Sequence, residues 1–158
     1  MGASGWDYVT SYTGSVEECL EALHARVFEE DYGDDDTYAS LDELWADEEF
    51  MGEEGTHSIL DIRRVERTSA PPQDFDPAEY GTLHPLPVDR VAHHFGTERP
   101  APALFRDLLA RSLEHTGPPD TRPRTLLDEC GMRWTGVYVV LYTGERPTHL
   151  GVFGYSGD

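Results

Sequence analysis

The clearest hydrophobic pattern in the chain is a helical one that begins after Ser15. Apolar residues recur three or four positions apart, as on one face of a helix, at Val16, Cys19, Leu20, Leu23 and Val27. Ser15 and Glu18 form a capping-box pair, and the same pair recurs as Ser40 and Glu43 ahead of a second, shorter apolar set. We therefore predict two helices in this part of the chain. Residues 29–37, which are charged and show no periodicity, are expected to form a mobile loop between them.

Segments rich in β-branched and aromatic residues predict the strands. Residues 8–12 have strand character near the start, and residues 56–65 alternate roughly between apolar and polar. Residues 134–142 and 150–155 are predicted to pair as a C-terminal β-hairpin across a longer loop at 143–147.

Two further helices are predicted between these strands. Pro87 suits the first position of a short helix that ends at Gly96, and Thr97 can cap a longer one that ends at Gly117. The resulting order, β-α-α-β-α-α-β-β, is typical of an α+β fold with a mostly antiparallel sheet and helices packed on it. We expect one domain, residues 1–158. Its core should include Leu20, Leu23, Val27, Leu60, Ile62, Leu108, Val139, Leu141 and Val152.

Composition limits the class of protein. Apolar residues make up 38% of the chain and aromatic residues 11%, which is enough for a packed core. No apolar run approaches the roughly 20 residues of a membrane helix, and the first residues do not resemble a secretory signal. With two cysteines, Cys19 and Cys130, expected as reduced thiols, we predict a cytoplasmic protein. The chain contains no lysine, which excludes Schiff-base and P-loop lysine chemistry.

The negative charge is concentrated in the first third of the chain. Residues 1–54 contain 17 carboxylates and one arginine, a net charge of −16, whereas residues 55–158 carry −3. Such a field favours a basic protein partner and disfavours nucleic acid. We assign the binding role to carboxylates without an evident structural task, namely Asp34, Asp35, Asp36, Glu48, Glu49, Glu53 and Glu54.

Three segments combine aromatic, hydroxyl and titratable side chains that could form a small-molecule site. They are residues 6–8, residues 55–61 and residues 154–158. In this hypothesis His57 is the acid–base group, Tyr155 a proton donor, and Asp158 or Tyr8 the orienting partner. The binding residues are Trp6, Tyr8, Ser58 and Ser156.

The geometry of a regular strand limits this chemistry. On such a strand His57 and Asp61 would lie about 13 Å apart, and Ser58 would face the other way. This excludes a local Ser-His-Asp triad unless the strand bulges, and a partner for His57 is expected from elsewhere in the chain. The simpler interpretation of His57 is a hydrogen-bonded histidine at the start of a strand.

No sequence pattern indicates a cofactor or a structural metal. His93 and His94 are adjacent on a predicted helix and diverge, and residues 34–36 lack the spacing of a calcium loop, although they could bind a divalent cation loosely. Nucleotide-binding glycine motifs are absent. We therefore expect no cofactor.

Met-Gly-Ala-Ser-Gly-Trp at 1–6, Gly-Thr-His-Ser-Ile-Leu-Asp at 55–61 and Gly-Tyr-Ser-Gly-Asp at 154–158 resemble the marks of an uncharacterised family of hypothetical proteins from high-GC bacteria. The resemblance covers the whole length in outline and implies no activity. It does imply that the three segments belong to one recurring design and could converge on a single pocket.

Two hypotheses of function follow. The first, which we favour, is an interaction protein similar to an immunity protein, which binds a basic partner through its acidic N-terminal third. The second is a small enzyme or ligand-binding domain with a pocket built by the two chain ends and residues 55–61. A flat acidic face around residues 29–54 would support the first, and a concave pocket that gathers His57 with the chain ends would support the second.

Overall fold

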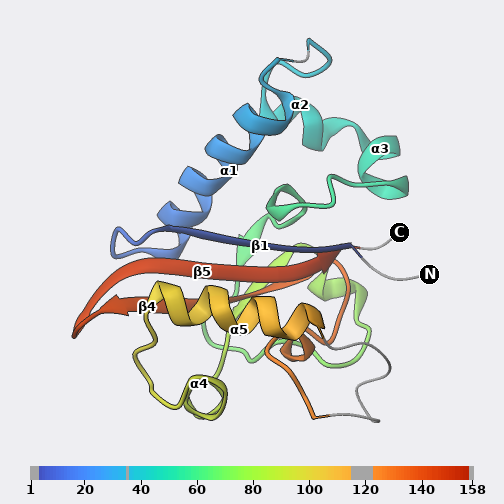
Figure 1. The fold of residues 1–158 in the computed structure, drawn as a ribbon. Helices are drawn as coiled ribbons and strands as arrows, with labels where there is room; N and C mark the ends of the chain where they lie inside the picture. The colour runs from blue at the N-terminus through green and yellow to red at the C-terminus, as the bar shows by residue number, and fades with distance from the viewer. Residues whose placement is uncertain (1–3, 35, 115–122, 157–158) are drawn as a thin grey trace.

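A five-stranded sheet divides the molecule into two helical layers (Figure 1). The computed structural model describes residues 4–34, 36–114 and 123–156. The strand order is β1-β5-β4-β3-β2, with bounds β1 Ser4–Ser11, β2 Arg64–Val65, β3 Thr82–Pro85, β4 Thr135–Thr143 and β5 Arg146–Ser156.

The sheet is mixed. Strand β5 pairs antiparallel with both β1 and β4, whereas β3 pairs parallel with β4 and with β2. The α+β class and the C-terminal hairpin are thus confirmed. The hairpin turn is tighter than predicted, because Thr143 pairs directly with Arg146 and Gly144 supplies the positive φ of 67° that a two-residue turn requires.

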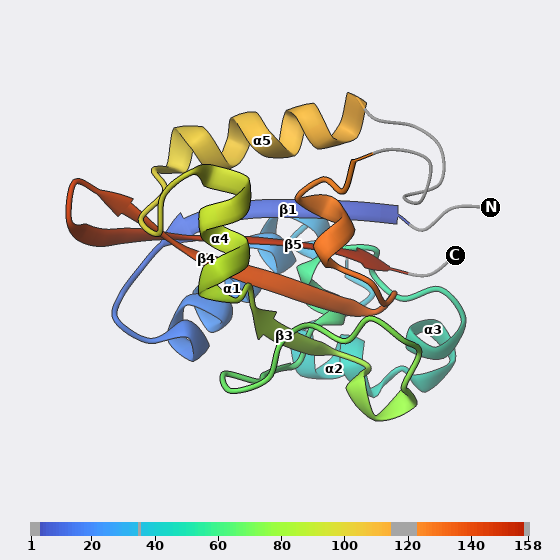
Figure 2. The same cartoon turned by 90° about the horizontal axis from the view of Figure 1, so that it is seen from below.

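Helices cover both faces of the sheet. Helices α1 (Val16–Tyr32), α2 (Leu41–Ala46) and α3 (Glu48–Glu53) lie on one side, and α4 (Val88–Phe95) and α5 (Pro102–Glu114) lie on the other (Figures 1 and 2). Ser15 and Ser40 cap α1 and α2 as predicted, since their hydroxyls accept from the backbone N–H of Glu18 and Glu43. In place of the reciprocal bond of a capping box, the Glu18 side chain accepts from the Thr13 hydroxyl and the Glu43 side chain from the Ala39 N–H. None of the helices in the described part of the chain has the length and apolar character needed to cross a membrane.

Part of the predicted acidic loop is helical. Helix α1 continues to Tyr32 because Phe28 and Tyr32 stack on each other and pack against the core beneath α1, with ring centroids 5.7 Å apart. Beyond the loop, the single helix predicted after Ser40 is interrupted at Asp47, whose side chain caps α3.

Two apolar clusters, one on each face of the sheet, form the core. One lies between the sheet and α1, and the other between the sheet and α4 and α5. Of the nine residues predicted for the core, all are buried except Leu108, which is half-buried because its neighbour Leu109 occupies the inward position of α5. The helical phase predicted for α1 is therefore confirmed.

The strand predicted at residues 56–65 is wrong. Only Arg64 and Val65 pair with a neighbouring strand, and residues 59–61 form a short 3-10 helix. The prediction also missed β3, a short parallel strand. Thr97 does not cap α5, since its hydroxyl accepts from Arg99 three residues before the helix begins, and Gly117 lies outside the described residues.

Candidate functional site

Residues 55–61 turn back on themselves around the carboxylate of Asp61. Its Oδ1 accepts from the Thr56 backbone N–H at 2.6 Å and from the Thr56 hydroxyl at 2.7 Å, and its Oδ2 accepts from the His57 N–H at 3.0 Å. The hydroxyl of Ser58 accepts from the N–H of Leu60 and caps the 3-10 helix. These side-chain acceptors compete with strand pairing, which is why the segment is not extended. The expected 13 Å separation of His57 and Asp61 is therefore wrong.

The first and last strands of the chain, β1 and β5, both contact this segment. The Ser156 hydroxyl at the end of β5 donates to Asp61 Oδ2 at 2.6 Å, and Trp6 Nε1 in β1 donates to the Ser156 hydroxyl at 3.3 Å. The indole of Trp6 lies against Gly136 and Gly154, where a Cβ atom would come within 2.8 and 2.6 Å of the ring. The structure thus brings together the three segments proposed from the sequence, the last of them as far as residue 156.

Tyr8 joins the same cluster from β1. Burial raises the pKa of Tyr8, and hydrogen bonds with the backbone of Ile59 and the side chain of Ser58 oppose that rise. Two backbone carbonyl groups of residues 55–61 contact side chains of α1 and α2. Ile59 O lies 3.3 Å from His24 Nε2, and Leu60 O accepts from Trp45 Nε1 at 2.7 Å.

The catalytic set proposed from the sequence is not assembled in the described part of the chain. Tyr155 packs on the α5 side of the sheet, whereas its neighbour Ser156 faces Asp61 on the α1 side, since successive side chains of a strand alternate. Asp158 lies outside the described residues. His57 is therefore separated from Tyr155 by the sheet.

Asp61 has a structural task in this arrangement. Its side chain is buried and accepts four hydrogen bonds, two on each oxygen. A buried carboxylate needs such partners to stay charged. Sequence reasoning missed this role, although Ser58 and Asp61 show the same Ser-x-x-acid spacing as the two capping boxes.

A cavity of about 430 Å³ lies beside this cluster. It is located where β2, β3 and β4 begin, next to the end of α3, and is lined by Met51, Gly52, Asp61, Arg63, Arg64, Tyr80, Gly81 and Trp134. Its volume falls in the range of small-molecule sites. Because its walls come from four separate segments, no local sequence pattern could have indicated it.

Two strained residues lie next to each other at this cavity. His57 and Trp134 are the non-glycine residues with positive φ among those described, at 54° and 66°, and their ring centroids are 6.4 Å apart. The Nδ1 atom of His57 is buried and has no hydrogen-bond partner in the described part of the chain. Strain of this kind is enriched at functional sites.

A second buried polar cluster lies on the α4 side of the sheet. Glu129 accepts from Arg90 Nε and Nη2 at 2.9 and 2.7 Å, and its Oε2 is 2.6 Å from His94 Nε2. His93, next to His94, is exposed. Within the described ranges, no three His, Cys, Asp or Glu side chains are grouped so that they could hold a metal.

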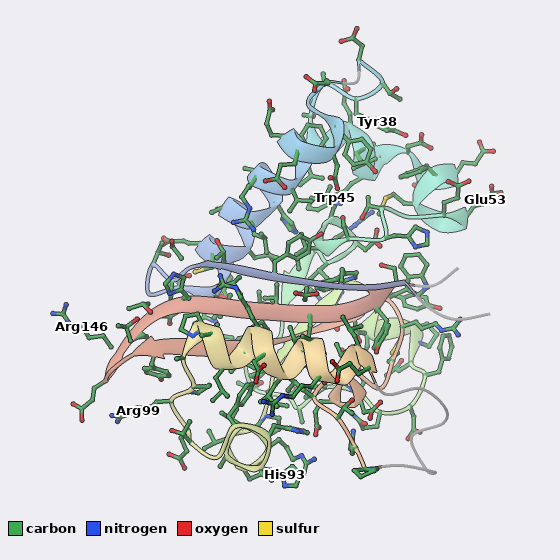
Figure 3. All side chains as sticks on the ribbon, viewed as in Figure 1. Tyr38, Trp45, Glu53, His93, Arg99 and Arg146 are labelled. Atoms are coloured by element: carbon green, nitrogen blue, oxygen red, sulfur yellow. The ribbon has the colours of Figure 1, made fainter. Side chains whose placement is uncertain are left out.

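The carboxylates assigned to partner binding lie on the outer side of the α1–α3 layer. Asp34 and Asp36 flank the turn between α1 and α2, and the glutamates lie on or next to α3, where Figure 3 labels Glu53. We call this set the acidic surface: Asp34, Asp36, Glu48, Glu49, Glu53 and Glu54, all exposed. Asp35 lies outside the described residues.

No protein-family model, curated protein or solved structure matches this chain. The resemblance of the three motifs to a family of hypothetical proteins therefore stays a prediction. Evidence on function comes from the geometry of the cluster, the cavity and the acidic surface.

Proposed function

We propose that this protein binds a basic partner protein through the acidic surface, in the manner of an immunity-type inhibitor. The observation that carries the proposal is the absence of positive charge from this part of the chain. No arginine or lysine occurs between residues 27 and 62, which contain 14 carboxylates. Exposed carboxylates without nearby cations raise the local negative potential.

Local structural roles account for only part of this charge. Glu43 accepts from the backbone N–H of Ala39, and Asp47 accepts from Phe50 N–H and from the Tyr38 hydroxyl, which together lower the pKa of Asp47. In the described part of the chain, the carboxylates of the acidic surface form no ion pair. Glu48 and Glu49 lie in the first turn of α3, where negative charge is favourable, but their side chains remain exposed.

The position of the acidic surface suits binding. The C-terminal part of α1, together with α2 and α3, extends away from the sheet, so that a partner can approach without contacting the α4–α5 layer (Figure 1). Electrostatic steering by such a surface increases the association rate more than it slows dissociation. Screening by salt acts over about 8 Å at physiological ionic strength, so the association rate should fall as salt is added.

The enzyme hypothesis has less support. Tyr155 lies across the sheet from His57, and the carboxylate of Asp61 is occupied by four hydrogen bonds. Tyr8, the other partner proposed for His57, bonds instead with the Ser58 side chain and the Ile59 backbone. The described residues therefore do not assemble the proposed catalytic set.

The proposal is tested with two variants that lose the same charge from different places. In the first, the six carboxylates of the acidic surface are replaced by amides. In the second, the replaced residues are six exposed carboxylates elsewhere: Asp74, Asp89, Glu98, Asp107, Glu114 and Glu145. A protein captured by the wild type counts as a partner only if the first variant fails to capture it and the second variant still captures it.

The rate at which such a partner associates with the wild type and with each variant is then measured at increasing salt concentration. We expect at least a tenfold slower association for the first variant and a steep salt dependence for the wild type, roughly as for other steered complexes. If the two variants behave alike, or if association is indifferent to salt, the acidic surface only keeps the protein in solution and the proposal is wrong.

A further inference from the structure

We infer that the cavity beside Trp134 is a binding site for a small aromatic anion, one flat ring that carries a carboxylate or a phosphoryl group. This inference is independent of the proposed protein partner. The cavity adjoins the Asp61 cluster at the beginnings of β2, β3 and β4, and its volume of about 430 Å³ leaves room for a ring of this kind with its substituent.

The walls provide flat apolar surface. The indole of Trp134, the phenol ring of Tyr80 and the side chain of Met51 line the cavity. Tyr80 is 45% exposed, and Met51 is half-buried, so both remain accessible from solvent. Aromatic and thioether side chains of this kind favour a planar apolar group through offset or edge-to-face contacts.

Arg63 supplies the positive charge. Its guanidinium lies 5.2 Å from the ring centroid of Trp45, and it forms no ion pair with a carboxylate of the described residues. The adjacent Arg64 is engaged, because it donates to Ala78 O at 2.5 Å and lies 3.5 Å from Glu66. Arg63 thus has donors available for an anion, and a guanidinium can bind both oxygens of a carboxylate or phosphate.

The negative group in the lining, Asp61, does not favour a cationic ligand. Both of its oxygens accept two hydrogen bonds from the chain, so it has no free acceptor to present to the cavity. Donation from two backbone N–H groups and two hydroxyls also spreads its charge. An anion next to Arg63 is therefore favoured over a cation next to Asp61.

The backbone holds the aromatic wall in place. Gly81 N–H donates to Trp134 O at 2.8 Å, and Gly81 O accepts from the N–H groups of Arg63 and Arg64 at 2.8 and 3.1 Å. Trp134 is thereby kept at a φ of 66°, a conformation that a residue with a bulky side chain rarely adopts. The neighbouring His57 is strained in the same way and has a buried, unpartnered Nδ1. Backbone strain of this kind is enriched at binding sites.

Calorimetric titration of the full chain tests the inference with benzoate, phenyl phosphate and the uncharged benzyl alcohol. Arg63→Gln removes the arginine of the lining that has no ion-pair partner among the described residues, and Arg146→Gln removes the same charge from the tip of the β4–β5 hairpin, far from the cavity (Figure 3). We expect at least one of the two anions to bind saturably, about tenfold more weakly to Arg63→Gln, and equally to Arg146→Gln and the wild type. Tighter binding of benzoate would indicate a carboxylate ligand, and tighter binding of phenyl phosphate would indicate a phosphate ligand.

A second variant, Trp134→Gly, tests the aromatic wall. Glycine tolerates the positive φ at this position, so the fold should be kept while the ring is lost, and anion binding should weaken by about tenfold. The inference is overturned if neither anion binds at millimolar concentration, if benzyl alcohol binds as tightly as the anions, or if Arg63→Gln binds as well as Arg146→Gln.

Discussion

Glu129 shows how single buried charges are stabilised in this protein. Burial by itself raises the pKa of Glu129, but hydrogen bonds from His94 and Arg90, together with the charges of Arg124 and Arg90, outweigh burial and lower the pKa from 4.5 to about 2. The carboxylate is therefore charged in the folded protein at every pH above that value. Its partners come from α4 and from the segment before residue 127, so the cluster ties two parts of the α4–α5 layer together.

This pKa predicts a dependence of stability on pH. Because the folded pKa lies below the unfolded one, the stabilisation by Glu129 is complete above pH 4.5 and is lost as the pH falls to about 2. Glu129→Gln should lower the free energy of unfolding at neutral pH by about 3 kcal/mol, since Arg90 and His94 lose a buried partner. Urea unfolding over this pH range measures both effects. Glu114→Gln, an exposed control, should leave the pH profile unchanged, and a Glu129→Gln profile identical to the wild type would contradict the prediction.

At the scale of elements, α1 and residues 55–61 form one unit. Helix α1 packs its apolar face on the sheet, and its His24 approaches the carbonyl of Ile59 at 3.3 Å. Burial lowers the pKa of His24, which keeps the imidazole neutral in this contact. The segment is thus fixed by the helix above it and by the Ser156 hydroxyl from the sheet.

Docking of α1 can be measured at Leu23, which is 1% exposed in the middle of its apolar face. Leu23→Ala should lower the free energy of unfolding by about 2–5 kcal/mol, because it removes buried methyl groups and leaves a cavity. Leu113→Ala removes the same atoms from an exposed position in α5 and is the matched control. A loss below about 1 kcal/mol at Leu23 would show that α1 is not docked as described.

The hydrogen bond between Asp61 and Ser156 joins the segment to the sheet. Ser156→Ala should cost about 1 kcal/mol, whereas Asp61→Asn should cost about 2–3 kcal/mol. The amide nitrogen replaces an oxygen that accepts from one backbone N–H and one hydroxyl; the hydroxyl can reverse and accept, but the backbone N–H loses its acceptor. A double-mutant cycle by chemical unfolding isolates the pair. Additive effects of the two substitutions would mean that Ser156 and Asp61 are not coupled.

For the whole molecule, the uneven charge is the dominant electrostatic feature. Among the described residues, two ion pairs involve a carboxylate of residues 1–54, and both are exposed. They join Arg26 with Glu30 at 4.0 Å and Arg67 with Glu17. Exposed pairs contribute little to stability. Repulsion among the carboxylates of α1–α3 is therefore largely uncompensated in the free protein.

This repulsion predicts a response to salt. The melting temperature of the wild type should rise with added salt, and the variant with an amide-substituted acidic surface should be more stable at low salt and less salt-dependent. Thermal unfolding followed by circular dichroism provides the measurement. The control variant with six substitutions elsewhere should retain most of the wild-type salt response. If the two variants respond equally, the repulsion is spread over the whole surface.

The sequence by itself determined the features that depend on neighbours in the chain. The periodicity after Ser15 and the two serine caps predicted α1 and α2, and two β-rich segments on either side of a loop predicted the β4–β5 hairpin, because these signals come from residues close together in the chain. The uneven charge was likewise visible without a structure. The order of elements was then enough to predict the α+β class.

Only the tertiary structure decided what depends on distant contacts. Residues 56–65 have the composition of a strand, but the buried Asp61 carboxylate and the Ser156 hydroxyl, 95 positions away, stabilise a turn instead. The four-residue β3 exists because β4 and β2 flank it on both sides. The contact between Ser156 and Asp61 and the cavity between Arg63 and Trp134 follow from the register and packing of segments far apart in the chain. Such contacts are set by the whole fold and leave no local pattern.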